Sequence, residues 1–347
     1  MKNKNLKKFV IPTLFLVFIL FSARIPALAE WYMQTCYPTI AVVLSFFSRW
    51  TPFSLFDWMI IAAIVVLLGS IVKMCKRRLS LRRWSNLLVL SIFWIVIWFY
   101  LSWGIAYFRY DFYERFGVEQ PTEDRDFFEM FVENYIFLLN KAYMEAPIFF
   151  DTKEVDAEIE YLYEKHRELL QLPHRSGWRR TKITLLEPLM TRMGVAGYFA
   201  PFFNEIHVNN FSLPISYPYT LAHEKAHQFG IASEAECNLF ATVICTASEH
   251  PLVRYSGYLQ TTSYLLGNLR KISPERYREI SEKIDPRIIA DYRAIREHWQ
   301  QGVNPTLSAM QEKVYDTYLK TNRQQSGVLS YSEMTGLLVA FFLKFNY

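Results

Sequence analysis

The run LAHEKAHQFGIASEAECNLFA, residues 221–241, decides the fold and the site expected of this chain. Residues 214–229 have helical character, and Gly230 follows at the position where left-handed backbone commonly ends a helix. His223 and His227 are four residues apart, so both imidazoles project from one face of that helix. The spacing therefore predicts a helix whose two histidines can share one metal ion.

The residue types in this helix favour zinc and hydrolysis. Neutral imidazoles suit Zn²⁺, which keeps an open position for water when three protein groups bind it. Glu224 follows the first histidine and can accept a proton from that water, while zinc polarises the scissile carbonyl. The HExxH pattern thus indicates a zinc-dependent hydrolase with Glu224 as general base. The alternative is a solvent-exposed helix with two unrelated histidines.

The third metal ligand is open between two acids. Metzincins place a histidine six residues after the second histidine, but Ser233 stands there. Glu234 and Glu236 open the next helix, and either carboxylate would complete a His₂Glu site. Each also has a structural role: Ser233 with Glu236 forms a capping-box signature, and Glu234 is a first-turn acid favoured by the helix dipole.

A resemblance bears on that choice. The run from Glu236 to Ala241 (ECNLFA) is similar to the EANxFA-type helix of gluzincins, zinc peptidases in which a glutamate ligand follows HExxH. In those proteins the glutamate before the small-residue–Asn pair binds the metal. The resemblance therefore implies His223, His227 and Glu236 as ligands, with Cys237 in place of the usual alanine.

The composition indicates membrane association. Hydrophobic residues make up 52% and aromatic residues 17% of the chain, both high for a soluble protein. Residues 1–105 hold twelve Lys or Arg against two acids, so the rest of the chain is net acidic at −5. The overall charge of +5 therefore belongs to segments that flank apolar runs, and we expect no nucleic-acid partner.

Three apolar runs are candidates for spans of the lipid bilayer. They lie at about residues 9–28, 56–74 and 84–103, and each has near the roughly 20 residues needed to cross the hydrocarbon core. The first run ends in a sequence that also fits a signal-peptide cleavage site. Residues 31–54 are interrupted by prolines and Arg49, so we expect an outer loop with a membrane-surface helix.

Basic residues set the expected orientation. Lys76–Arg78 and Arg82–Arg83 separate the second and third runs, which by the positive-inside tendency puts this loop in the cytoplasm. Residues 106–347 then lie on the extracytoplasmic side of the cytoplasmic (inner) membrane. A fourth crossing within residues 31–54 would invert that topology.

The expected fold class is α+β. N-terminal transmembrane helices in residues 1–105 precede a mainly helical, zincin-like domain in residues 106–347, which carries a small β-sheet. Within this domain we expect helices at 122–146, 154–172 and 337–345, and strands at 182–187, 194–199 and 204–209. The four cysteines have no CxxC spacing, and no disulfide is expected.

Most of the chain resembles an uncharacterised bacterial membrane family called domain of unknown function 3810. The resemblance rests on the HEKAHQFG helix and on the runs PFSLFDW, WGIAYFRYDF, GVAGYFAPFFNEIHVN, RYSGY (254–258) and SGVLSYSE. It implies a zinc-dependent membrane protein and indicates no substrate.

Three further residues are weaker candidates. Tyr255 follows the glutamate helix and could stabilise a tetrahedral oxyanion, although aromatic packing is the alternative. Asn204 and His207 lie in the expected strand before the HExxH helix. They could contact an extended substrate that pairs with the strand edge.

The leading functional hypothesis is a membrane-anchored zinc metallopeptidase that cleaves an extracytoplasmic peptide or protein. The alternatives are a zinc amidase acting on cell-wall material and a non-catalytic membrane module stabilised by zinc. Glu224 favours catalysis, because a structural zinc site has no need of that carboxylate.

Overall fold

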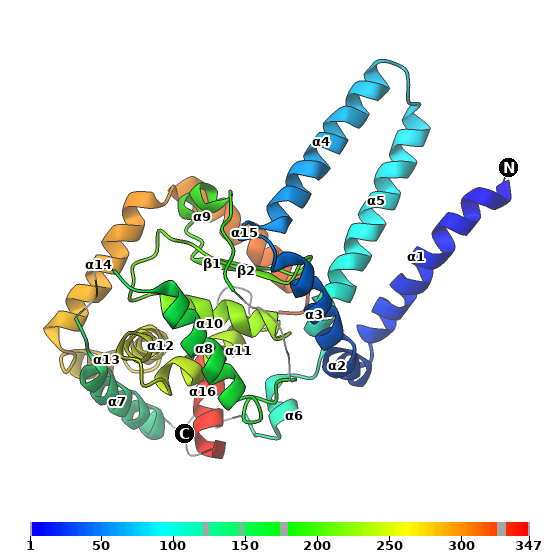
Figure 1. The fold of residues 1–347 in the computed structure, drawn as a ribbon. Helices are drawn as coiled ribbons and strands as arrows, with labels where there is room; N and C mark the ends of the chain where they lie inside the picture. The colour runs from blue at the N-terminus through cyan, green and yellow to red at the C-terminus, as the bar shows by residue number, and fades with distance from the viewer. Residues whose placement is uncertain are drawn as a thin grey trace. The chain divides into compact units, whose positions relative to one another are not determined.

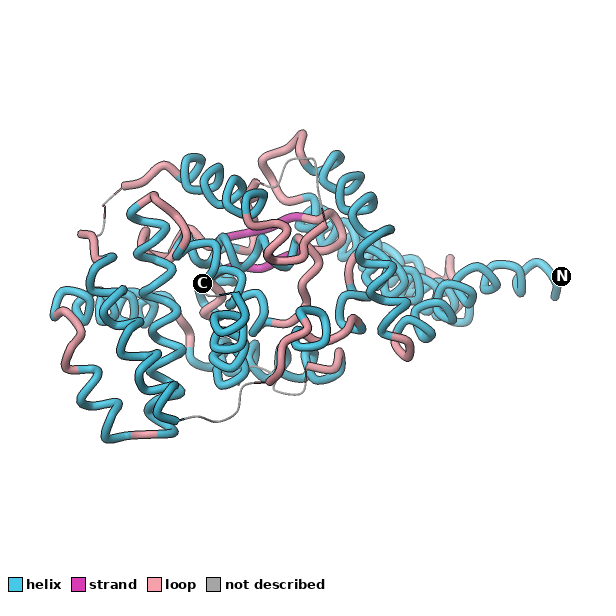
Figure 2. The backbone as a smooth tube through the Cα atoms, turned by 90° about the horizontal axis from the view of Figure 1, so that it is seen from below, coloured by secondary structure: helices cyan, strands magenta, loops and turns pink. Residues whose placement is uncertain are grey.

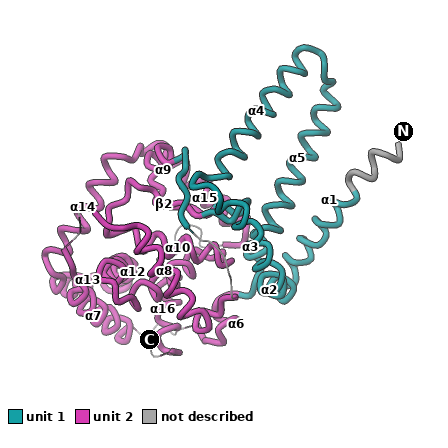
Figure 3. Tube along the Cα trace, viewed as in Figure 1, with its two compact units in different colours: residues 1–110, 175–186, 200–205 teal, residues 111–174, 187–199, 206–347 magenta. Residues whose placement is uncertain are grey.

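The computed structural model describes residues 2–120, 125–145, 147, 149–173, 180–324 and 331–345. The chain divides into two compact units, which Figure 3 colours separately. Unit 1 contains Met1–Tyr110, Arg175–Leu186 and Ala200–Glu205, and unit 2 contains Asp111–His174, Glu187–Phe199 and Ile206–Tyr347.

Unit 1 is helical and contains the apolar helices (Figure 1). Its elements are α1 (Lys2–Ser22), α2 (Pro26–Thr35), α3 (Tyr37–Ser48), α4 (Leu55–Cys75), α5 (Leu81–Ser102) and the 3₁₀ helix η1 (Gly104–Phe108). The helices α4 and α5 are long and apolar enough to cross a membrane, and they match the second and third predicted spans. This agrees with membrane association.

The first predicted span, residues 9–28, is not one straight helix. The chain ends α1 at Ser22 and starts α2 at Pro26, with a bend of 112° between the two helices. The bend follows from Pro26, because proline has no N–H for a continuing helix and forces the preceding Ile25 into extended backbone. The described residues thus contain two helices that could span a membrane, or three if the bent pair counts as one.

The segment at residues 31–54 is more helical than the single surface helix that we expected. It contains the end of α2 and all of α3, joined through Cys36. Tyr37, Ala41 and Leu44 are buried on one side of α3, while Phe46 and Phe47 are exposed on the other. An apolar surface on both sides fits a helix in contact with lipid.

The prediction of a strand at residues 182–187 is wrong. Ile183 makes only an isolated parallel bridge with Phe53, and α9 (Glu187–Met193) begins at the end of the segment. The backbone N–H of Leu185 donates to the Asp57 carboxylate at 2.6 Å instead of to a neighbouring strand. That carboxylate also accepts from the Thr184 hydroxyl, so side-chain bonds replace a β-ladder here.

Unit 2 is built from helices around a two-stranded sheet (Figure 2). Its elements are α6 (Phe112–Phe116), α7 (Arg125–Ala142), α8 (Thr152–Lys165), α9, α10 (Tyr217–Gln228), α11 (Glu234–Thr246), α12 (Pro251–Ile272), α13 (Pro274–Ser281), α14 (Pro286–Gly302), α15 (Pro305–Thr321) and α16 (Tyr331–Phe345). The strands β1 (Gly197–Ala200) and β2 (Glu205–Val208) confirm the small sheet. The end of β1, the turn at 201–204 and the first residue of β2 are assigned to unit 1.

Several helix predictions for this unit are confirmed within the described residues. The helix expected at 122–146 is α7, and residues 122–124 and 146 lie outside the description. The helix expected at 154–172 ends earlier, because the chain enters turns after Lys165. The apolar stretch at 337–345 is part of α16, whose residues Leu337, Leu338 and Phe341 are buried in the core as expected.

The centre of unit 2 is α11. Eleven of its thirteen residues are buried, and it packs against α10, α12 and α16. The HExxH helix α10 is similarly enclosed, with ten buried residues out of twelve. The helix is therefore enclosed in the core and is not solvent-exposed, as the alternative to a metal site required.

The buried ammonium group of Lys225 links α10 to α8 through ion pairs. The ammonium group of Lys225 is fully buried, and it lies 2.8 Å from Asp156 and 2.6 Å from Glu160. The Tyr163 hydroxyl of α8 donates to the Ala222 carbonyl of α10 at 2.6 Å. These polar bonds fix the HExxH helix against a second helix.

Removal of that cation should destabilise the fold. In Lys225→Ala, two carboxylates would face a vacated interior site, and we expect unfolding to become easier by about 3 kcal/mol. The measurement is thermal unfolding of the full chain in detergent. Lys165→Ala, which removes an exposed lysine at the end of α8, is the matched control. Equal melting temperatures for the two variants would refute the role of the buried cation.

Candidate metal centre

The turn between α10 and α11 brings the site together. Gly230 has a φ of +90°, and its N–H donates to the His227 carbonyl at 2.9 Å. The next N–H, from Ile231, donates to the Ala226 carbonyl at 3.3 Å. This is a Schellman ending, in which glycine takes the left-handed position at no steric cost. The chain reverses within a few residues and starts α11 at Glu234.

The reversal places a carboxylate against both histidines. His223 Nε2 lies 3.2 Å from Glu234 Oε2, and His227 Nε2 lies 3.4 Å from Glu234 Oε1. Donor atoms of these three residues all lie within 4.8 Å of one another. Their side chains are 15%, 9% and 18% exposed, so the group borders solvent without being open to it. Such a cluster has the composition of a His₂Glu metal site.

The other nitrogen of each imidazole is held by the protein. His223 Nδ1 lies 2.9 Å from the Asn238 side-chain oxygen, and His227 Nδ1 lies 2.9 Å from the Ile231 carbonyl. Both oxygens accept a hydrogen, so each ring donates from Nδ1 and has Nε2 on the side of Glu234. Partners of this kind fix the tautomer and orientation of metal-binding histidines.

The structure brings Glu234, and not Glu236, to the histidines. Glu236 forms an ion pair with Arg115 of α6, and both side chains are buried. Its backbone N–H donates to the Ser233 hydroxyl, so the residue takes part in the cap of α11. The expectation that Glu236 completes the cluster does not match this geometry. Two residues along a helix is a rotation of about 200°, which turns the two acids in opposite directions.

The proposed base, Glu224, lies in a tight and apolar position. It is 5% exposed, and its Oε2 has no hydrogen-bond partner among the residues that the structure describes. A Cβ atom on Gly197 of β1 would lie 2.8 Å from its Oε1, so only glycine leaves room for the carboxylate there. Burial raises the pKa of Glu224, which makes the carboxylate a stronger proton acceptor.

The ionisation state of Glu234 favours a cation. Burial opposes ionisation of this carboxyl, but the imidazoles of His227 and His223 outweigh it and hold its pKa well below the usual range. Glu234 is therefore a carboxylate, the form that binds metal ions. The Tyr315 hydroxyl of α15 donates to Glu234 Oε1 and fixes the orientation of this group.

The three weaker candidates have other partners. The Tyr255 hydroxyl donates to Asp291 at 2.5 Å and the residue is fully buried, which leaves no free donor for an oxyanion. His207 is fully buried and stacks on Tyr198 at 4.2 Å. Asn204 belongs to unit 1, where its amide donates to the Ala41 carbonyl and the Ser45 hydroxyl. None of the three belongs to the group that could hold a metal ion.

Four residues of the site were not foreseen from the sequence. Asn238, four residues after Glu234, lies on the same face of α11 and could have been found from that spacing. Gly197, Arg115 and Tyr315 come from segments distant in the chain and carry no local pattern. Their roles depend on tertiary contacts alone.

The arrangement fits a divalent metal ion. Two imidazoles with oriented Nε2 atoms face one carboxylate, and the buried Glu224 carboxylate has an oxygen that no donor of the described residues reaches. All four cysteines are free thiols, and Cys237 lies on the Nδ1 side of His227, 3.3 Å from that atom. The donor set is therefore of nitrogen and oxygen, which suits zinc with an open position for water.

Comparison with known proteins identifies a family but indicates no activity. A family model described as "Protein of unknown function (DUF3810)" matches residues 32–339. No curated protein and no solved structure matches the chain.

Exchange of each acid for its amide should separate the two glutamates. We expect Glu234→Gln to lose stoichiometric zinc, because a neutral amide is a poor ligand, while its melting temperature in metal-free buffer stays close to that of the wild type. Glu236→Gln should keep zinc but unfold more easily, by roughly 3 kcal/mol, since Arg115 loses a buried counter-charge. Metal content by mass spectrometry and melting of the full chain in detergent provide both readouts.

The reverse pattern would contradict the assignment. If Glu236→Gln loses zinc and Glu234→Gln retains it, the third ligand is the one implied by the gluzincin resemblance.

Proposed function

The chain belongs to the DUF3810 family, and we propose that it is a membrane-anchored zinc-dependent hydrolase that cleaves peptide bonds. The observation that carries the proposal is the convergence of His223, His227 and Glu234 on one point beside the buried Glu224. We take this helix and the neighbouring strand β1 as a zincin-like arrangement.

The chain's own groups supply the positioning and the proton transfer. His223 and His227, oriented through their Nδ1 atoms, would hold zinc together with Glu234. Zinc supplies Lewis acidity that makes a water acidic and polarises the scissile carbonyl. Glu224, whose Oε2 has no hydrogen-bond partner among the described residues, would accept a proton from the attacking water and pass it to the leaving amine, the usual task of a general base that becomes a general acid.

The burial of Glu224 supports catalysis over a structural metal. A structural zinc site is closed by its ligands and needs no further carboxylate. A buried carboxylate with an unpartnered oxygen is costly, since it loses hydration without a compensating bond. Retention of that group beside three ligand atoms is what a hydrolytic site requires.

The strand beside Glu224 supports an extended peptide as substrate. Gly197 of β1 approaches the Glu224 carboxylate, and Phe199 stacks at 6.5 Å on His227. Within the described residues β1 pairs only with β2, which leaves its second edge for another strand. Addition of an extended peptide to such an edge would align its carbonyls by main-chain hydrogen bonds. We therefore favour a peptidase over an amidase, with β1 rather than β2 as the substrate strand.

The proposed position of the chain in the membrane rests on the apolar helices. We propose that α4 and α5 cross the cytoplasmic membrane and that the basic residues 76–83, which form the loop between them and the start of α5, lie in the cytoplasm. The metal site would then face the extracytoplasmic side and act on peptides or proteins there.

Loss of the base should abolish turnover without loss of metal. In Glu224→Gln the residue keeps its size but cannot accept a proton, so we expect hydrolysis to fall roughly 100- to 10,000-fold. Zinc content should equal that of the wild type. The assay is digestion of a random peptide library by the full chain in detergent, followed by mass spectrometry.

The control for this variant is Glu168→Gln, which alters a side chain that is 91% exposed. Activity of Glu224→Gln at the level of this control would remove the proposed base. If muropeptides are cleaved and no library peptide is, the amidase alternative replaces the peptidase.

A methyl group at position 197 should perturb the base indirectly. Gly197→Ala would place a Cβ 2.8 Å from Glu224 Oε1 and 3.0 Å from the His207 carbonyl, so the carboxylate must move. We expect activity to fall roughly 10- to 100-fold with zinc affinity unchanged. Gly267→Ala, where no atom lies within 4 Å, should leave the rate unchanged. Equal rates for the two variants would show that the contact between β1 and Glu224 is unimportant.

A further inference from the structure

The helix α15 is loosely packed although it contacts the metal-binding group. Of its seventeen residues only Leu319 is buried, and Met310 and Val314 are 60% and 69% exposed. Yet Tyr315, in the middle of the helix, donates its hydroxyl hydrogen to Glu234 Oε1. A helix with so little buried surface gains little from hydrophobic packing, so polar bonds contribute to its docking, and the bond of Tyr315 to a charged group is one of them.

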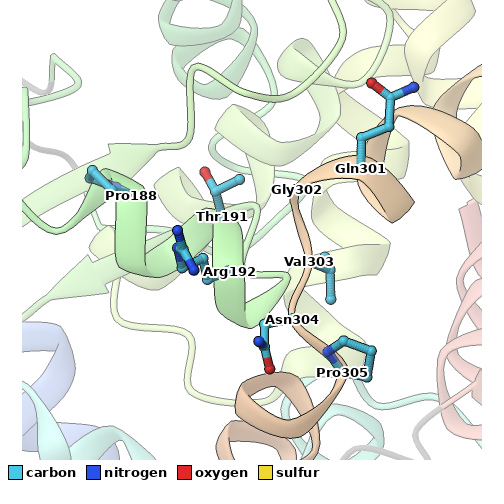
Figure 4. A pocket seen from close by; sticks show the side chains of 8 residues that line it. All are labelled: Pro188, Thr191, Arg192, Gln301, Gly302, Val303, Asn304 and Pro305. Atoms are coloured by element: carbon cyan, nitrogen blue, oxygen red, sulfur yellow. The ribbon is translucent and has the colours of Figure 1, made fainter.

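The segment before α15 has the features of a pivot. The Asn304 N–H is fixed to the Arg192 carbonyl at 2.8 Å, and the Asn304 side chain caps α15. Beyond this anchor, Gly302–Pro305 borders a hollow of about 520 Å³ with Pro188, Thr191 and Arg192 of α9 on its other side (Figure 4). The start of α15 is thus held against α9 and has open space beside it.

We infer that α15 docks on the His223–His227–Glu234 group through the Tyr315 hydroxyl, and that this docking is coupled to metal occupancy of the group. In this inference, which rests on the metal site of the proposed function, Tyr315 is a positioning residue. Its hydrogen bond uses one lone pair of Glu234 Oε1 and holds the carboxylate facing the histidines. The ordered carboxylate loses less freedom when it binds a cation, so the bond strengthens metal binding.

Thermodynamic linkage makes the coupling reciprocal. If a docked α15 increases the affinity for zinc by some factor, zinc must increase the equilibrium constant for docking by the same factor. Removal of a partner that orients a ligand typically costs 10- to 100-fold in metal affinity, so a change of about that size is expected for both quantities.

The test is backbone hydrogen exchange of α15 in the full chain in detergent, after removal of metal by a chelator and after addition of Zn²⁺ alone. In the wild type, zinc should slow exchange of residues 305–321 by roughly 10- to 100-fold. In Tyr315→Phe, the slowing should disappear and the zinc dissociation constant should rise by the same factor. Tyr161→Phe, which removes the hydroxyl of a 60% exposed tyrosine on α8, is the matched control.

The outcomes separate this inference from the proposed function. If the wild type binds zinc stoichiometrically but hydrogen exchange in α15 does not change with zinc, the coupling between α15 docking and zinc is refuted and the metal site stands. Wild-type zinc affinity in Tyr315→Phe would also refute it. If the wild type binds no zinc, both proposals fail together. The measurement on the wild type alone is decisive should the variant not fold.

Discussion

The site depends on the left-handed backbone of Gly230. A Schellman ending there stops α10 directly after its second histidine and returns the chain so that α11 begins at Glu234. Any side chain at this position would raise the cost of the turn and disturb the first residues of α11. The carboxylate and the two imidazoles meet only because this reversal is short. Packing of α11 by eleven buried residues then holds the result in place.

The sequence was informative about short-range geometry. The spacing of His223 and His227, the glycine after the helix and the serine cap of the next helix all predict local structure, and each is seen. Local sequence could not decide between Glu234 and Glu236 as the third ligand, because that choice depends on the rotation of α11 about its axis relative to α10. The run ECNLFA resembles a ligand helix of gluzincins, yet here Arg115 engages the glutamate of that run.

Long-range contacts explain the remaining differences. Gly197 and Tyr315 approach Glu224 and Glu234 from segments far along the chain, and no sequence pattern indicates either contact. The segment expected as a strand at 182–187 makes only one isolated bridge, because the Leu185 N–H donates to the Asp57 carboxylate instead of to a neighbouring strand. The first apolar run differs for a local reason. Composition identified α4 and α5, whereas the bend before Pro26 divides the first run into two helices.

The central claim is that two histidines and a carboxylate bind zinc. X-ray absorption at the zinc edge, on the full chain purified in detergent and loaded with zinc, measures those ligands most directly. The account predicts a shell of two imidazole nitrogens with oxygen as the only other donor, and the imidazole signature lost in His223→Ala with His227→Ala. Absence of bound zinc, or a sulfur ligand from the nearby Cys237, would contradict it.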